Sequence, residues 1–236
     1  MEPLGEWDSF ITEALSTEPL LEAASYSWLL AVVELNHLEV LVRRGQASGA
    51  GKLAAWVNEK VRTESGHIVA ALSAVSAAER MAVGDGAAAL DLLAVSEAAF
   101  RVQGGFWWAA CLPLAVRTAL AAGDRRLAER LASAVEPPQP LCRHARAAAE
   151  ALVVEARGEH EAAAEGFADA AARWHDFCVP YEEAQALLGR GRCLVALGRA
   201  PEAAVLLAAA REIFARLGAK PVLAETDELM QKVSSA

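Results

Sequence analysis

The sequence has few of the residues that favour β-strands and no segment suited to crossing a membrane. Aromatic residues make up 6% of its 236 positions, and β-branched residues are sparse beside the alanine, leucine, glutamate and arginine that favour helices. The most apolar stretch, residues 27–42, contains Glu34, Asn36, His37 and Glu39, whose polar groups argue against a membrane span. We therefore expect an all-α protein without a membrane-spanning helix.

Positive charge is also in deficit. The chain carries 22 Lys and Arg residues against 31 Asp and Glu residues, a formal net charge of −9. A domain that binds duplex nucleic acid needs a basic stripe, whereas the arginines within 125–126 and 143–146 form only local clusters, which we assign to a solvated helix face. Direct binding to nucleic acid is therefore not expected.

The cysteines do not form a CxxC pair. The four of them stand in apolar or alanine-rich surroundings: Cys111, Cys142, Cys178 and Cys193. Such surroundings predict buried free thiols in a cytoplasmic protein. The first residues, MEPLGEWDSF, lack a positive region followed by an apolar run, so a signal peptide is not expected either.

What the sequence does contain is a regular series of glycines. They are separated by 39, 39, 35 and 40 positions: Gly45, Gly84, Gly123, Gly158 and Gly198. Each follows an apolar helical stretch, and an alanine stands five residues after each: Ala50, Ala89, Ala128, Ala163 and Ala203. A recurrence of this length is typical of stacked helical hairpins, which usually work by presenting a surface rather than by catalysis.

Apolar periodicity and helix-breaking residues predict about eleven helices. Their spans are 19–44, 47–64, 67–82, 86–101, 106–122, 125–135, 140–157, 159–176, 181–197, 201–217 and 221–233. The connections are short, so neighbouring helices should be antiparallel and belong to one domain over residues 1–236. Its parts would be a lead-in at 1–18, divergent hairpins at 19–139, the best-formed repeats at 140–219, and a capping helix and tail at 220–236.

The last two hairpins have the clearest pattern. Gly191 and Ala203 stand seven residues before and five after Gly198, and Ala151 and Ala163 have the same offsets from Gly158. We expect these small residues to face each other and let the helices approach closely. The segment 180–219, PYEEAQALLGRGRCLVALGRAPEAAVLLAAAREIFARLGA, resembles a tetratricopeptide (TPR) repeat. It is similar to the C-terminal helical repeats of actinobacterial signalling ATPases, namely LuxR-type regulators and class III cyclase-associated ATPases.

This resemblance implies an α-solenoid, a right-handed superhelix of about five TPR-like hairpins with a C-terminal capping helix. It implies a non-catalytic protein-interaction or sensor scaffold of a bacterial signalling or transcription-regulatory ATPase. The alternatives are a small-effector-binding domain of a LuxR-type regulator and a homo-oligomerisation module, such as a homodimer. The partner would be a protein, a peptide or neighbouring domains of a larger signalling protein, with no cofactor, nucleic acid or membrane involved.

In TPR folds the first helix of each hairpin lines the concave face. Counting from the turn glycines, the partner-binding residues on that face are Leu35, Glu39, Arg43, Arg117, Leu152, Glu155, Leu188 and Arg192. Trp107 and Trp108 are added because they flank a glycine turn and tryptophan is over-represented at binding hot spots. The alternative for this pair is that one ring packs between hairpins and the other covers a hairpin edge.

No catalytic, cofactor or metal site is predicted. The segment 46–53 resembles a phosphate-binding loop but has Gln46 and Leu53 where that motif needs glycine and serine or threonine. His175–Cys178 and Cys142–His144 have ligand-like spacing but lie in different expected hairpins. Glu182 and Glu183 fall in the first turn of a helix, where we expect solvated carboxylates rather than an acid–base pair.

Overall fold

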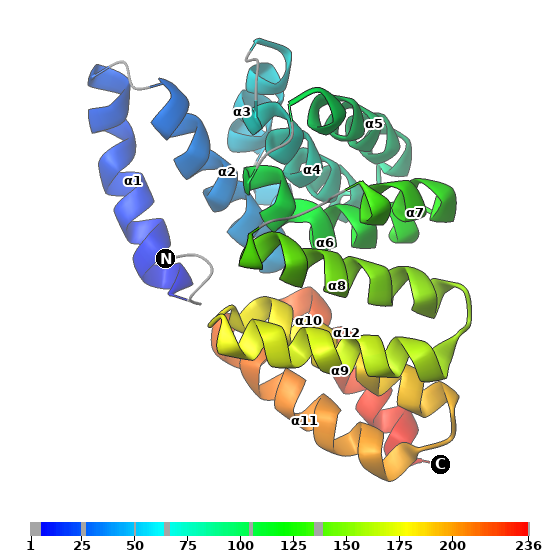
Figure 1. The fold of residues 1–236 in the computed structure, drawn as a ribbon. Helices are drawn as coiled ribbons and strands as arrows, with labels where there is room; N and C mark the ends of the chain where they lie inside the picture. Colours follow the sequence, from blue (N-terminus) through cyan, green and yellow to red (C-terminus); the bar gives the residue numbers. More distant parts are fainter. Residues whose placement is uncertain are drawn as a thin grey trace.

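The computed structural model describes residues 6–24, 27–49, 51–63, 67–103, 106–134 and 139–235, and these are helical with no strand among them (Figure 1). The helices are α1 (Trp7–Ala23), α2 (Ser27–Arg43), α3 (Gly51–Thr63), α4 (His67–Ala82), α5 (Gly86–Gln103), α6 (Phe106–Ala121), α7 (Arg125–Ser133), α8 (Pro140–Ala156), α9 (His160–Asp176), α10 (Pro180–Ala196), α11 (Ala200–Leu217) and α12 (Lys220–Ser234). A short 3₁₀ turn, Ala47–Gly49, connects α2 to α3. The prediction of an all-α protein is confirmed.

The beginning of the chain differs from the prediction. A single helix over 19–44 is wrong, because α1 and α2 are separate and most of the expected lead-in is helical. Pro19, the first residue of that expected span, lies inside α1. The buried residues of α1 are Trp7, Ala14 and Leu21, one every second turn. So sparse an apolar stripe gives little periodic signal.

The five glycines of the series end helices in the left-handed conformation, with φ between +72° and +86°. At Gly198 the turn is closed by two backbone bonds, from the Gly198 amide to the Val195 carbonyl and from the Arg199 amide to the Leu194 carbonyl. These two hydrogen bonds satisfy carbonyl groups that the end of the helix would otherwise leave without a partner. The turn favours glycine at position 198 because its backbone has a positive φ. Cys178 has the same turn between α9 and α10 with φ +58°.

Glycines of α10 allow the neighbouring helices to pack closely against it. A methyl group added at Gly189 would lie 2.6 Å from the ring of Phe167 on α9, and one added at Gly191 would lie 2.6 Å from Leu207 on α11. The side chain nearest to Gly191 is thus that of Leu207, one turn after Ala203 on α11. Ala203 is fully buried in the same core.

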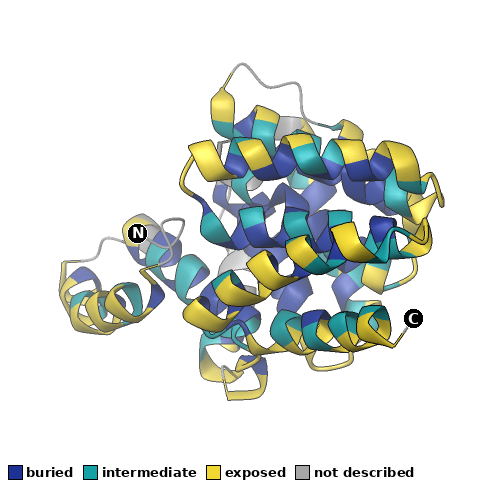
Figure 2. Ribbon diagram, turned by 90° about the horizontal axis from the view of Figure 1, so that it is seen from below, coloured by how far each residue is buried: buried dark blue, intermediate teal, exposed yellow. Residues whose placement is uncertain are grey.

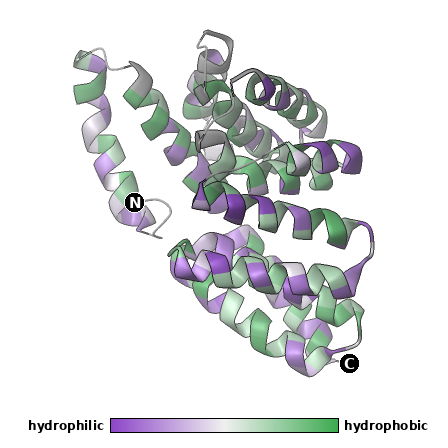
Figure 3. Cartoon of the chain, viewed as in Figure 1, coloured by the Kyte–Doolittle hydropathy of each residue, from purple (hydrophilic) through white to green (hydrophobic). Residues whose placement is uncertain are grey.

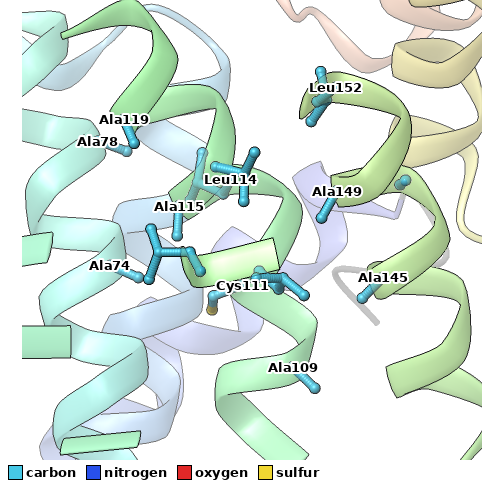
Figure 4. Close-up of a cluster of buried hydrophobic side chains, with 14 of the residues drawn as sticks. Ala74, Ala78, Ala109, Cys111, Leu114, Ala115, Ala119, Ala145, Ala149 and Leu152 are labelled. Carbon is cyan, nitrogen blue, oxygen red and sulfur yellow. The ribbon is translucent and has the colours of Figure 1, made fainter. Parts of the chain in front are cut away.

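The interior consists of two clusters of buried apolar residues. The larger one runs from α2 to α10 and is rich in alanine where α4, α6 and α8 meet (Figure 4). The smaller one lies among α10, α11 and α12. Exposed positions lie on the outer faces of the helices (Figure 2), and hydrophilic and hydrophobic residues alternate along α8, as expected for a helix with one buried face (Figure 3).

The last helix covers the smaller cluster. Val222, Leu229 and Met230 of α12 pack against its buried residues, while Lys220 and Lys232 are exposed. None of the described helices is both long and apolar enough to span a membrane.

Elements from the two ends of the chain lie against each other. The Arg44 side chain, just after α2, donates a hydrogen bond from Nε to the carbonyl of Leu217, 3.3 Å away. Pro221 of α12 lies so near Gly45 that a Cβ there would be 2.9 Å from its ring. The start of α1 points towards the C-terminal helices (Figure 1), and its Trp7 ring contacts Tyr181 of α10.

Candidate functional site

A buried ion pair joins α6 to α10. Arg117 donates from Nη1 to Oε2 of Glu182 at 2.8 Å and from Nη2 to Oε1 at 2.7 Å. Glu182 is only 4% exposed. Two parallel charge-assisted bonds are the strongest geometry available to an arginine and a carboxylate. The pair therefore fixes the first turn of α10 against the C-terminal half of α6.

Arg43 connects α2 to the same site. Its Nη2 donates to Glu39 at 2.6 Å and lies 3.6 Å from Oε1 of Glu182. The guanidinium carbon lies 4.3 Å from the ring centroid of Tyr181, a favourable cation–π distance. Glu39, Arg43, Arg117 and Glu182 together form what we call the inner ionic cluster, which balances two cations with two carboxylates.

Glu182 and Arg117 keep their charges near neutral pH. Burial alone would raise the pKa of Glu182, but Arg117 and Arg43 outweigh it and hold the pKa below its usual value. Burial likewise opposes the charge on Arg117, yet Glu182 prevails and raises the pKa of the guanidinium. Burial also raises the pKa of Tyr181. Glu182, Arg117 and Tyr181 therefore do not exchange protons near pH 7, so the arrangement suits structure or binding rather than acid–base chemistry.

The expectation that Glu182 is solvated is wrong. Its turn of α10 faces inward, so Tyr181 and Glu182 are both buried. The neighbouring Glu183 is half-buried, with 20% of its side chain exposed, and it pairs at 3.0 Å with His175, whose side chain is 73% exposed. The burial of Glu182 cannot be predicted from the residues next to it in the sequence, because its partner Arg117 is 65 positions away.

A second ionic group links α8, α10 and α12. Arg192 donates from Nε and Nη2 to the two oxygens of Glu155, at 2.7 and 2.8 Å, and from Nη1 to Glu225 at 3.0 Å. Burial opposes the charge, but Glu155 outweighs it and raises the pKa of Arg192. This group is more exposed than the inner ionic cluster.

The partner-binding residues predicted from sequence thus contact other parts of the chain. Glu39, Arg43 and Arg117 meet in the inner ionic cluster, and Glu155 meets Arg192. The three predicted leucines are buried in the cores: Leu35, Leu152 and Leu188. Trp107 and Trp108 start α6, but their side chains lie outside the described residues.

A cleft of about 470 Å³ opens beside the inner ionic cluster. Its walls are the C-terminal ends of α2, α4 and α6, the 3₁₀ turn, and Pro221 at the start of α12. Apolar side chains such as Met81 and Leu114 dominate the lining, to which Arg117 and Thr118 add polar groups. Arg117 therefore belongs to the cleft and to the ionic cluster at once.

The remaining chemical candidates do not assemble into a site. Gly51 begins α3 after a 3₁₀ turn that follows a helix, whereas a phosphate-binding loop follows a strand. The His144 ring packs edge-on against Trp174 and Phe177, with centroids 5.7 and 5.1 Å away. Across the part of the chain that the structure describes, no three His, Cys, Asp or Glu side chains are placed to hold a metal ion.

The expectation of four buried thiols is correct for three of them. Cys111, Cys142 and Cys193 are buried, but Cys178 is exposed because it occupies the turn between α9 and α10. Burial raises the pKa of Cys193 to about 12, so this thiol stays protonated and unreactive at neutral pH.

Comparison with known proteins gives no relative: no family model, no curated protein and no solved structure matches this chain.

Proposed function

We propose that this chain is a non-catalytic sensor and protein-interaction scaffold of a bacterial, cytoplasmic signalling or transcription-regulatory ATPase. Its fold would be a right-handed TPR-like superhelix of about five hairpins closed by α12. The resemblance of residues 180–219 to a TPR repeat and the series of left-handed glycines support this proposal. The mechanism is coupling, in which a bound partner favours one arrangement of the helices.

The main observation behind this proposal is that Arg117 takes part in both the cleft and the inner ionic cluster. It lines the cleft, and it holds α6 to α10 through Glu182. A ligand that touches Arg117 in the cleft therefore touches the link that sets how these helices are arranged. Differential contact with that link is what allows binding at one place to be read elsewhere in the protein.

The partner that fits the proposal is a protein segment or neighbouring domain that places an apolar side chain in the cleft. A second candidate is a small effector, since about 470 Å³ lies within the range of small-molecule sites. The mainly apolar lining, with the guanidinium of Arg117 and the hydroxyls of Ser48 and Thr118, suits a ligand that has an apolar body and a hydrogen-bond acceptor.

A cleft-filling variant tests both candidates. Ala121 is exposed on the cleft wall, so Ala121→Trp should fill the cleft without entering the core. Ala208→Trp, at an exposed position of α11, is the matched control. The measurements are thermal shifts with a metabolite panel and binding to any ATPase or DNA-binding segment that genome sequencing finds encoded beside this chain.

Binding that is lost in Ala121→Trp and kept in Ala208→Trp supports the proposal, and the ligand found decides between the two candidates. Binding that is equal in both variants would place the site elsewhere. If no metabolite or encoded segment binds and light scattering shows a stable homodimer, the assembly role replaces the sensor role.

A further inference from the structure

We propose that Trp7 is a latch that holds the two ends of the chain together and thereby controls access to the cleft. The role of the latch in ligand access rests on the proposed function of the cleft. The closure itself is a physical property that can be measured without any ligand.

Trp7 belongs to the core of the other end of the chain. Its side chain is only 1% exposed, and its ring centroid lies 5.5 Å from that of Tyr181 on α10. It is part of the smaller buried cluster, whose other members come mainly from α10 and α11, including Phe214 and Leu217. A residue of the first helix therefore packs with residues about two hundred positions later.

The rest of α1 is held more lightly. This helix packs mainly on α2, and only Ala14 and Leu21 are buried in addition to Trp7. Leu15 and Leu20 are exposed on its outer side. The residue before the helix, Glu6, makes no capping hydrogen bond with its side chain. An edge helix with few buried contacts opens at lower free energy than the core. Trp7 is the α1 residue that is buried in the cluster of α10 and α11, and the half-buried Phe10 and Ile11 pack against that cluster.

Trp7 also covers two arginines at the end of α2, Arg43 and Arg44. The guanidinium carbons of Arg43 and Arg44 lie 6.0 and 5.6 Å from its ring. Tyr181 and Trp7 both contact Arg43, so removing the indole would let water reach this cation and weaken its interactions in the inner ionic cluster. The Arg44–Asp8 ion pair at 2.8 Å could not hold α1 in place of Trp7, because the Asp8 side chain is 91% exposed and such pairs contribute little.

The latch controls the cleft because the cleft has walls from both ends of the chain. Val42 and Gly45 come from the N-terminal part of the chain and Pro221 from the C-terminal part. The proline ring is so near Gly45 that an added Cβ would be only 2.9 Å away. Separation of α1 and α2 from α12 would therefore widen the cleft and admit a ligand larger than the closed form accepts.

Distances between two spin labels test the latch directly. The labels are placed on Glu13→Cys in α1 and Glu212→Cys in α11, both exposed, with Cys178→Gly removing the one exposed native thiol. We expect one narrow distance distribution in this background. Adding Trp7→Ala should create a longer, broader population that becomes the major one, whereas Trp7→Phe should keep most of the short distance.

Leu20→Ala is the matched control, since it removes an exposed apolar side chain from the same helix and should change nothing. A folded Trp7→Ala variant with the unchanged short distance would overturn the latch. Should that variant not fold, native-state hydrogen exchange of the wild type decides the matter. The latch requires the amides of α1 to open at lower free energy than those of α10, and opening of both only in global unfolding would contradict it.

These readouts separate the latch from the proposed function. A distance change without any ligand binding would support the latch and count against the sensor role. If a ligand binds in the cleft but Trp7→Ala leaves the distance between the two spin labels unchanged, the sensor role is supported and the latch is rejected.

Discussion

Arg117 and Glu182 form a two-point ion pair, at 2.8 and 2.7 Å, although 65 positions separate them in the chain. The pair joins α6 to α10, and Arg43 of α2 lies 3.6 Å from the same carboxylate. Three helices that are far apart in sequence therefore share one charged site. Because the site is buried and balanced, each of its members depends on the others.

Loss of the central carboxylate should be costly. Glu182→Gln leaves Arg117 and Arg43 without their shared counter-charge, and breaking a buried pair in this way costs about 3 kcal/mol of unfolding free energy. Urea unfolding followed by circular dichroism measures it. The control is Glu183→Gln, which should change the unfolding free energy by less than about 0.5 kcal/mol, because Glu183 pairs with His175, whose side chain is exposed. Equal effects of the two variants would contradict the central role of Glu182.

The same carboxylate predicts a dependence of stability on pH. The pKa of Glu182 is lowered in the folded state, so its contribution is fully present above the pKa of the unfolded chain. It is lost as the pH falls through the lower, folded-state pKa. The difference in unfolding free energy between wild type and Glu182→Gln should therefore shrink from roughly pH 5 downwards. A difference that stays constant to pH 3 would show that the charge of Glu182 is not what stabilises the fold.

Close packing at α10 predicts that one added methyl group will be harmful. Gly189→Ala places a Cβ 2.6 Å from the Phe167 ring, and overpacking of this kind costs about 1–3 kcal/mol. Gly86→Ala is the control, because it starts α5 and an added Cβ would meet only Met81 at 4.0 Å. That variant should be neutral or slightly stabilising, since alanine favours helices. Thermal unfolding of both variants checks this pair, and a harmless Gly189→Ala would mean that α9 and α10 are not so tightly packed.

The turn at Cys178 predicts a stabilising substitution. Its φ of +58° is unfavourable for a residue with a side chain. Cys178→Gly should raise the unfolding free energy by about 0.5–1 kcal/mol, the relief of strain less the greater freedom of glycine in the unfolded chain. Gly198→Ala, at the matching turn after α10, should lower it by a similar amount or more. Opposite signs for the two variants are the expected result, and destabilisation by both would indicate that the Cys178 side chain has a role beyond its conformation.

The sequence predicts those parts of the fold that depend on local chemistry. The glycine turns were found because a left-handed residue after a helix favours glycine, and the helices after residue 67 follow clear apolar periods. α1 was missed because Trp7, Ala14 and Leu21 are spaced too widely to give a pattern.

The site was only partly predictable, because it depends on contacts between distant segments. Counting from the glycines found Glu39, Arg43 and Arg117, but the same reasoning took their charges to be available to a partner. It missed Glu182 and Tyr181, since a carboxylate in the first turn of a helix is usually solvated. It missed Trp7 because nothing near that residue in sequence indicates a partner on α10.

On the proposed function and the latch together, a ligand in the cleft changes how the two ends of the chain are held together. The direct measurement is the distance between labels at Glu13→Cys and Glu212→Cys, with and without a ligand found in the binding screen, in the wild-type background and in Ala121→Trp. We predict that the ligand shifts the distance distribution in the wild-type background and leaves it unchanged in Ala121→Trp. A ligand that binds in the cleft and leaves the wild-type distribution unchanged would contradict it.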